Sequence, residues 1–294
     1  MKKLCKLIFF VIKVTAIIAL INHHVKLLAR SLKGKKTEDE LSHSYRFGNI
    51  SYTKKGSGPA MLLLHNPVMN GSKEEWDALI EGLSARYTVF APDLPGFGYS
   101  EYPSISYSSY LYASFINSFI EDVIKLPAIV MASGKSADFS ICAASLKRAN
   151  FEKLILISPN GFSEAPVRCK IRQAMKRFME VPVYGTFVYN MIWLSALAIE
   201  VAKTLPNPNL PKTIKSSKFA MAALWSGELD LNIKDAAHKT GVSTFIALGN
   251  TDSISGIPAG IDTKLFCDAD GLPHLGNDSE KFVDEVQLWL ESQV

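Results

Sequence analysis

From residue 44 onward, short apolar runs alternate with helical patterns, and this alternation constrains the fold more than any other feature of the chain. Strand-type runs lie at 47–52, 60–65, 88–92, 128–133, 153–158, 243–248 and 264–268. Helical patterns lie at 72–86, 109–126 and 279–291, with Ser72 and Glu75 spaced as a capping box. The pattern predicts an α/β fold with a mostly parallel central sheet and helices on both faces.

The alternation is interrupted once, between residues 161 and 242. This stretch is helical in pattern, contains prolines at 206, 208 and 211, and is too long for a simple connection. We therefore expect a core formed by 44–160 and 243–294, with 161–242 inserted as a helical lid. Open α/β sheets bind ligands at the carboxyl ends of their strands, where such an insertion would lie.

Residues 1–36 differ from the remainder in charge and hydropathy. They contain nine Lys and Arg residues and no Asp or Glu, whereas the rest of the chain carries 23 basic and 28 acidic residues. Residues 7–21 are apolar apart from Lys13 and Thr15, and a helix over 4–28 would span a hydrocarbon core of roughly 30 Å. The leader is therefore predicted to attach the protein to a membrane.

An uncleaved anchor or interfacial helix and a cleaved signal peptide both remain open for this leader. The absence of a small-x-small cleavage site after the apolar run favours the anchor. Five basic residues follow the run (Lys26, Arg30, Lys33, Lys35 and Lys36), against three lysines before it. The positive-inside rule then favours a main domain on the cytoplasmic side.

Charge and cysteine content exclude other classes of protein. The body has no basic stripe with interleaved aromatic residues, so a nucleic-acid partner is not expected. The four cysteines are far apart, at positions 5, 142, 169 and 267, and form no pattern typical of a zinc site or a disulfide framework. No metal or organic cofactor is expected.

The segment 128–146 predicts a strand, a sharp turn and a helix, with a serine at the turn. Gly134 and Ser136 match the first two fixed positions of G-x-S-x-G, and Asp138 replaces the last glycine. In such a turn the serine oxygen is lifted clear of the sheet, and the following helix N-terminus favours negative charge nearby. Ser136 is the candidate nucleophile, and Ser133, within the strand, is the alternative.

Further motifs make residues 44–294 resemble the α/β-hydrolase superfamily. They are the strand LLLH followed by Asn66, the downstream Trp76, and the loop DLPGFGYS from Asp93 to Ser100. The resemblance implies the chain order nucleophile, acid, histidine, with a lid ahead of the acid. Ser136, Asp252 and His274 occur in that order and form the predicted triad, in which Asp252 would orient His274.

Three departures from the superfamily pattern count against activity. Pro67 stands where the second oxyanion donor is usually found, and proline has no N–H. Ala137 and, in a shifted loop, Val68 are the remaining candidate oxyanion donors. Asp138 places a carboxylate near the nucleophile, while the neighbouring Lys135 could screen it or meet an anionic substrate.

The leading hypothesis is a serine hydrolase that acts on carboxylic esters or acyl lipids. Asn66, Lys135, Phe187 and Trp193 are candidate substrate contacts, although the aromatic residues of the insertion could equally pack its own core. The alternative is a catalytically impaired member of the fold that binds a ligand or a partner at the membrane.

Overall fold

The computed structural model describes residues 2–32, 40–162, 169–204, 214–250, 252, 256–258, 260–266, 272–275 and 279–292. Parts of three predicted segments lie outside these ranges. They are residues 33–36 of the leader, residues 163–168 and 205–213 of the insertion, and residues 267–268 of the last predicted strand.

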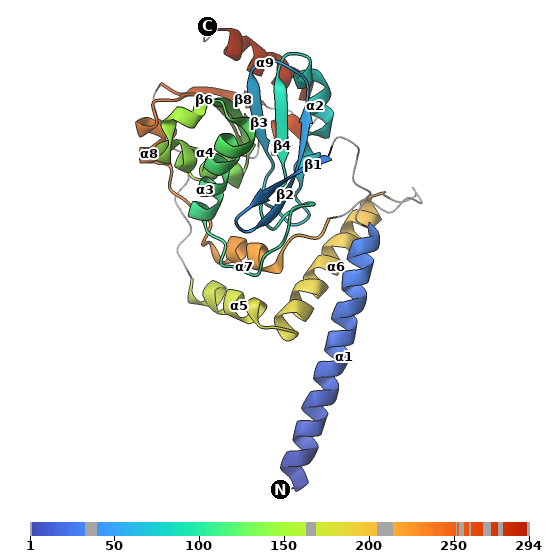
Figure 1. The fold of residues 1–294 in the computed structure, drawn as a ribbon. Coiled ribbons are helices and arrows are strands. Elements are labelled where there is room, and N and C mark those ends of the chain that lie inside the picture. Colours follow the sequence, from blue (N-terminus) through green and yellow to red (C-terminus); the bar gives the residue numbers. More distant parts are fainter. Residues whose placement is uncertain are drawn as a thin grey trace.

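An eight-stranded sheet forms the centre of the described chain, with the strand order β1-β2-β4-β3-β5-β6-β7-β8 (Figure 1). The strands are β1 (Glu40–Tyr45), β2 (Gly48–Lys55), β3 (Ala60–Leu64), β4 (Thr88–Pro92), β5 (Ala128–Ser133), β6 (Phe151–Ile157), β7 (Ser243–Gly249) and β8 (Asp262–Phe266). The β1–β2 and β2–β4 pairs are antiparallel and all other pairs are parallel. The predicted α/β fold with a mostly parallel sheet is confirmed.

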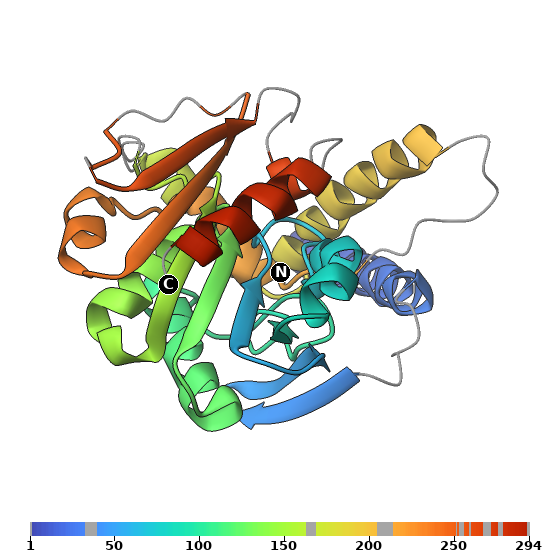
Figure 2. The ribbon, with the colours of Figure 1, turned by 90° about the horizontal axis from the view of Figure 1, so that it is seen from above.

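The two faces of the sheet are covered by different helices (Figure 2). Successive side chains of a strand point to opposite faces, so Met61 and Leu63 of β3 pack with one core and Leu62 and Leu64 with the other. The first core includes α2 (Asp77–Ser84) and α9 (Ser279–Ser292), and the second includes α3 (Ser109–Phe119) and α4 (Lys135–Leu146). Strands buried on both faces explain the continuous apolar runs of the sequence.

Two predicted helices differ in detail from the observed ones. The segment 72–86 begins with a 3-10 turn over Lys73–Trp76 before α2, and Ser72 makes no side-chain capping bond, so the predicted capping box is wrong. Glu75 turns away from Ser72 because its carboxylate binds three partners elsewhere. The predicted helix 109–126 ends as a π-helical turn, Ile120–Ile124.

The residues between β6 and β7 contain four described helices, in agreement with the helical pattern of the predicted insertion. They are α5 (Lys170–Glu180), α6 (Tyr184–Thr204), α7 (Lys218–Ser226) and α8 (Lys234–Lys239). In Figure 1, α5, α6 and α7 lie beneath the sheet, on the side toward α1. Whether they act as a lid remains a prediction.

The first helix, α1 (Lys2–Leu32), extends away from the body and packs along α6 with its second half (Figure 1). Asn22 donates a side-chain hydrogen bond to the carbonyl of Val183 (2.9 Å) and accepts one from Asn190 (2.8 Å). Trp193 is fully buried in an apolar cluster with Val25 and Leu197. The apolar side chains from position 4 to 21 of α1 are largely exposed.

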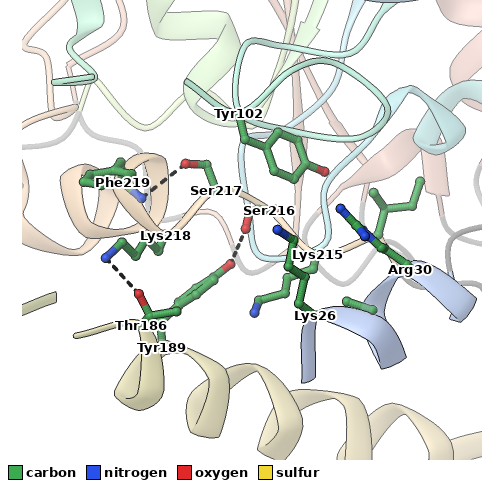
Figure 3. A pocket seen from close by; sticks show the side chains of 12 residues that line it. Lys26, Arg30, Tyr102, Thr186, Tyr189, Lys215, Ser216, Ser217, Lys218 and Phe219 are labelled. Atoms are coloured by element: carbon green, nitrogen blue, oxygen red, sulfur yellow. Dashed lines mark hydrogen bonds between the residues drawn. The ribbon is translucent and has the colours of Figure 1, made fainter. Parts of the chain in front are cut away.

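A cavity of about 390 Å³ lies where α1, α6 and the segment before α7 meet (Figure 3). Its walls come from four separate parts of the chain, namely α1, Tyr102, α6 and residues 214–219. The cavity therefore exists only because the leader helix packs against the insertion.

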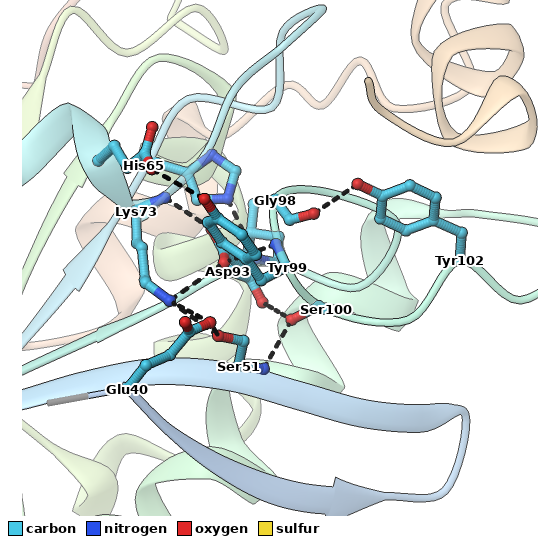
Figure 4. Close-up of polar contacts among 11 residues, drawn as sticks. Glu40, Ser51, His65, Lys73, Asp93, Gly98, Tyr99, Ser100 and Tyr102 are labelled. Carbon is cyan, nitrogen blue, oxygen red and sulfur yellow. Dashed lines mark hydrogen bonds and ion pairs between the residues drawn. The ribbon is translucent and has the colours of Figure 1, made fainter. Parts of the chain in front are cut away.

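A buried ion cluster fastens β1 to the loop after β4 (Figure 4). The Lys73 ammonium lies 3.0 Å from a Glu40 carboxylate oxygen, 3.5 Å from one of Asp93 and 2.8 Å from the Ser51 hydroxyl. Asp93 also accepts the backbone N–H groups of Lys73 (2.7 Å) and Tyr99 (2.8 Å), so it shapes the DLPGFGYS loop. All three charged side chains are at most 7% exposed, so the cation is needed to neutralise two buried carboxylates.

Replacing Lys73 with alanine is expected to lower the free energy of unfolding by about 3–5 kcal/mol, because Glu40 and Asp93 would be left buried without a cation. Urea denaturation followed by circular dichroism measures the loss. The control is Lys55→Ala, which breaks an exposed ion pair with Glu81 and should cost less than about 1 kcal/mol. Equal losses in the two variants would contradict the assigned role.

Candidate active site

The turn between β5 and α4 is the point where a nucleophile would be expected. Its backbone has φ 54° and ψ −126° at Gly134, directly after the end of β5 and before the start of α4. This conformation is strained for residues that have a Cβ, and a nucleophile elbow places its nucleophile on such a turn. The structure thus puts a glycine, which has no side chain, at the elbow position.

The side chain of Asn66 fills the space beside Gly134. A Cβ built on Gly134 would lie 2.4 Å from the Asn66 Cγ and Oδ1 atoms and 2.6 Å from Nδ2. The backbone N–H of Lys135 points to Asn66 Oδ1, at a long N–O distance of 3.4 Å. In a nucleophile elbow the N–H of the residue after the nucleophile is an oxyanion donor. Here that N–H faces an amide oxygen of the protein itself.

Ser136 lies two residues past the elbow, in the first turn of α4. It is fully buried, and its hydroxyl donates a hydrogen bond of 2.6 Å to the carbonyl of His65. This bond ties the start of α4 to the chain that leaves β3. The G-x-S match in the sequence placed Ser136 at the turn, whereas the backbone places Gly134 there. The geometry does not favour Ser136 as a nucleophile.

His274 lies in a 3-10 turn, Pro273–Leu275, and is only 1% exposed. Its ring stacks on that of Trp76, with centroids 4.6 Å apart, and its Nε2–H donates to Glu75 Oε1 at 2.8 Å. The Nδ1 atom is buried and has no hydrogen-bond partner. The imidazole is therefore held by an aromatic ring on its face and a carboxylate at its edge.

Glu75 is a residue of this site that the sequence did not reveal. Its carboxylate accepts the backbone N–H of Asn66 (2.8 Å), the Ser133 hydroxyl and the His274 ring. Burial alone would raise the pKa of Glu75, but its hydrogen bond and charge interaction with His274, the nearby His65 and the Ser133 hydroxyl together hold the pKa below its ordinary value. These partners are far from Glu75 in sequence, so no local pattern marks the role.

Asp252 closes its own loop. Its carboxylate accepts the backbone N–H of Gly249 at 2.8 Å, and its N–H donates to the Gly249 carbonyl at 3.1 Å. The structure describes all three predicted triad members, Asp252, Ser136 and His274, and the side chain of each forms hydrogen bonds with residues outside the triad. The structure does not bring the three predicted triad members together by hydrogen bonding, and their catalytic role stays a prediction.

The predicted oxyanion donors are also engaged in the backbone. Ala137 N–H donates to the Gly134 carbonyl (3.1 Å), and Val68 N–H donates to the Asn66 carbonyl (2.8 Å). Of the predicted substrate contacts on α6, Phe187 is half-buried and Trp193 is fully buried, where its indole N–H donates to Asn70 Oδ1 at 2.9 Å. Trp193 thus belongs to the packing between α6 and its neighbours.

A second group of charges lies on the other side of the turn. Lys135 forms an ion pair with Asp230, and both side chains are largely buried. Asp138 is fully buried, and one of its carboxylate oxygens accepts the N–H of Gly161 (2.9 Å) while the other has no partner. Burial raises the pKa of Asp138 to about 7, against the opposing effects of the Gly161 hydrogen bond and the Lys135 charge.

Among the residues that the structure describes, no group of three or more His, Cys, Asp or Glu side chains is placed to hold a metal ion.

Comparison with known families agrees with the fold. A family model described as alpha/beta hydrolase fold matches residues 59–193, a stretch that includes β3 to β6, the Gly134 turn and the first half of α6. The chain has the α/β-hydrolase fold. The likeness rests on these elements and on the sheet topology, in which the strands β3 to β8 are parallel.

Several curated proteins resemble part of this α/β-hydrolase-fold chain. An uncharacterised protein of Mycobacterium tuberculosis is 29% identical over 126 residues, 42% of this chain and 34% of that protein. The 2-(acetamidomethylene)succinate hydrolase of Mesorhizobium japonicum is 32% identical over 96 residues, a third of this chain (33%) and 34% of that one. The pimeloyl-[acyl-carrier protein] methyl ester esterase of Aeromonas hydrophila is 42% identical over 52 residues, 18% and 20% of the two chains. The matched stretch spans about a third or less of each relative.

Solved structures show the same fold at low sequence identity. An E-2-(acetamidomethylene)succinate hydrolase superposes with a TM-score of 0.66 at 17% identity, covering 86% of this chain and 98% of that one. A membrane phospholipase A, described as a bacterial virulence factor, superposes with a TM-score of 0.64 at 18% identity and covers 99% of both chains. At these identities the similarity concerns the fold.

Replacing Glu75 with glutamine is expected to lower the free energy of unfolding at pH 7 by about 1.5–3 kcal/mol, because a charged acceptor for His274 and two other donors is lost. The pKa of Glu75 is lowered on folding, so its stabilisation is present above its ordinary pKa of 4.5 and is lost as the pH falls through the folded value. The difference between wild type and variant, measured by urea denaturation, should therefore shrink in acid.

The control is Glu121→Gln, which removes an exposed carboxylate whose pKa is also lowered, chiefly by Lys147, and which should cost less than about 1 kcal/mol. A Glu75→Gln difference that is independent of pH would show that the carboxylate charge is not what stabilises this site.

Asp138→Asn tests the buried carboxyl group beside the turn. The folded protein holds a proton on Asp138 up to about pH 7, whereas the unfolded chain releases it near pH 3.8. Between these values the native state binds the extra proton, so wild-type stability should decrease as the pH rises from about 4 to 7. In the variant this contribution disappears, and denaturation curves at pH 5 and pH 8 should lie closer together. Parallel pH dependence in the two proteins would contradict the raised pKa.

Proposed function

We propose that this chain is a membrane-tethered member of the α/β-hydrolase fold that binds its ligand without covalent catalysis. The observation that carries the proposal is Gly134 at the elbow, with the Asn66 amide filling the space where a nucleophile side chain would project. An elbow without a nucleophile cannot form an acyl-enzyme intermediate at that position.

Other features of the site support the same proposal. Pro67 has no N–H to offer an oxyanion, and the loss of one such donor costs roughly 10²–10³ in turnover. The Lys135 N–H already faces Asn66 Oδ1, and His274 is bound to Glu75. A glycine thus stands in place of the nucleophile, one oxyanion donor is a proline and the other faces Asn66, and the histidine is bound to Glu75. Changes in all three parts of the machinery favour a lost activity over a single unusual residue.

The tether is the α1 helix. Its 31 residues rise about 46 Å, more than a hydrocarbon core of roughly 30 Å, and its most apolar window has a mean hydropathy of 2.5. A helix of this kind near an N-terminus is also compatible with a signal sequence. The hydrogen bonds of Asn22 with Val183 and Asn190 favour a retained anchor, because cleavage after α1 would remove a donor to the Val183 carbonyl and the acceptor of the Asn190 amide N–H. The basic residues after the apolar run favour a cytoplasmic main domain.

A serine hydrolase acting on carboxylic esters or acyl lipids is the second candidate. The named relatives favour it, since one is an esterase and one a hydrolase. In this mechanism Ser136 would attack, His274 would move the proton and Asp252 would orient the ring. The Ser136 hydroxyl would have to leave the His65 carbonyl, and His274 would have to leave Glu75.

Activity-based labelling separates the two candidates. We expect the purified wild-type protein neither to react with a fluorophosphonate nor to hydrolyse short- and long-chain nitrophenyl esters, in parallel with an active serine esterase as a positive control. Ser136→Ala should behave like wild type in both assays and lose about 1 kcal/mol of stability, because its hydrogen bond to His65 is removed. Labelling of wild type that disappears in Ser136→Ala would establish the serine hydrolase and overturn the proposal.

A further inference from the structure

The cavity beside α1 has the size and composition of a ligand site. Its volume of about 390 Å³ lies within the range of roughly 300–1,000 Å³ that is usual for small-molecule pockets. Figure 3 shows its walls, which come from the second half of α1, from Tyr102, from α6, and from residues 214–219 before and at the start of α7. None of its lining residues belongs to the Gly134 elbow, so binding of a ligand in this cavity does not depend on catalysis at the elbow.

Four cations line this cavity. They are Lys26 and Arg30 of α1 together with Lys215 and Lys218 at the start of α7. No Asp or Glu stands among its lining residues in the described part of the chain. A pocket with four positive charges and no carboxylate of its own favours an anionic occupant.

The two inner lysines differ in their partners, and among the described contacts only Lys215 is held by neutral groups alone. Lys215 donates to the Asn190 side-chain oxygen, and its ammonium lies 4.9 Å and 5.3 Å from the ring centroids of Tyr189 and Trp193. Lys218 donates to the Thr186 hydroxyl at 3.0 Å and to the carbonyls of Glu180 (3.4 Å) and Val181 (3.3 Å), and the Glu180 charge opposes the lowering of its pKa by burial. Burial lowers the pKa of Lys215 to about 8, which reflects the cost of holding this charge without an anion.

The two cations on α1 are free to reach an occupant. Lys26 and Arg30 are exposed and make no hydrogen bond or ion pair with any described residue. Arg30 carries a planar guanidinium that can bind two oxygens of a phosphate group at once. Both side chains extend from α1 toward Lys215, which lies close by in the view of Figure 3.

The remaining lining residues are three hydroxyl residues (Thr186, Ser216 and Ser217) and five apolar or aromatic ones. Ala29, Tyr102, Tyr189, Ile214 and Phe219 contribute hydrocarbon surface. The cavity also lies at a defined distance from the apolar part of α1. The exposed apolar stretch of α1 ends at Ile21, so Lys26 and Arg30 lie roughly 8 Å and 14 Å further along the helix axis. With the apolar stretch in the hydrocarbon core, these cations would stand at the depth of the phospholipid head groups.

We propose that this cavity binds the phosphate group of an anionic phospholipid, with Arg30, Lys26 and Lys215 around the phosphate and the apolar walls against the glycerol and upper acyl carbons. The inference rests on the proposed anchoring of α1, but not on the absence of catalysis.

Titration calorimetry on the full chain in a neutral detergent tests the ligand class. The ligands are dihexanoyl phosphatidylglycerol, dihexanoyl phosphatidylcholine and inorganic phosphate. We expect the phosphatidylglycerol to bind at least tenfold more tightly than either of the others, because only this ligand combines an uncompensated phosphate charge with acyl chains. Equal affinity for the phosphatidylcholine, or for inorganic phosphate, would overturn the proposal.

Two double variants, each of which removes two positive charges, distinguish binding in the cavity from non-specific electrostatic attraction of an anionic lipid to the protein. Lys26→Met with Arg30→Met should weaken binding of the phosphatidylglycerol at least tenfold and leave the fold intact, because neither side chain has a partner in the described structure. Lys170→Met with Arg172→Met removes two exposed cations of α5 outside the cavity and should leave the affinity unchanged. The same loss in both variants would overturn the site.

The anchoring is tested separately by sedimentation with vesicles of pure phosphatidylcholine. These vesicles carry no net charge, so the basic residues do not add to their binding. Sedimentation without selective lipid binding would overturn the cavity and keep the anchor. Selective binding of the short-chain lipid without sedimentation would overturn the anchor and support the cavity.

Discussion

The close contact between Asn66 and Gly134 is the constraint on which the rest of the site depends. Gly134 adopts a positive φ at the sharp turn from β5 to α4, and its missing side chain makes room for the Asn66 amide. Asn66 is fixed in turn by its backbone N–H, which donates to Glu75, and the same carboxylate holds Ser133 and His274. Because Gly134 has no side chain, Asn66 fits beside it, and through Glu75 it connects the ends of β3 and β5 with His274 in the C-terminal part of the chain.

This arrangement gives a structural purpose to residue types that often serve catalysis. In a serine hydrolase the histidine must exchange protons with a nucleophile, and its partner carboxylate stands behind the ring. Here Glu75 binds the Nε2 edge, while Trp76 covers the ring face, so proton exchange with solvent is restricted. A buried carboxylate whose oxygens are all hydrogen-bonded stabilises the fold around the turn. The same network would have to be broken before His274 could act as a base.

The sequence predicted the fold better than the site, for physical reasons. Strands that are buried on both faces and an amphipathic last helix can be recognised from local hydrophobic patterns. In the last helix, the predicted core residues are buried as expected, namely Phe282, Val286, Trp289 and Leu290. The edge strand β1 was missed because ELSHSY is mostly polar. The elbow could not be placed with certainty, because ASGKS allows its turn at Gly134 or Ser136 and only the backbone φ decides between them. Glu75 looked like a capping residue because its partners lie far away in sequence.

The helix α1 and the insertion are also linked by contacts next to the cavity. Trp193 packs against Val25 of α1 and donates to Asn70, in the loop that follows Pro67. Asn70 in turn donates its backbone N–H to Ser216, beside Lys215. A ligand held between α1 and Lys215 would therefore lie beside Ser216, which is hydrogen-bonded to Asn70 in the loop that carries Asn66. Contacts therefore run from α1 through Trp193 and Asn70 to the loop after β3, so the packing of α1 and the position of the Asn66 loop depend on shared residues.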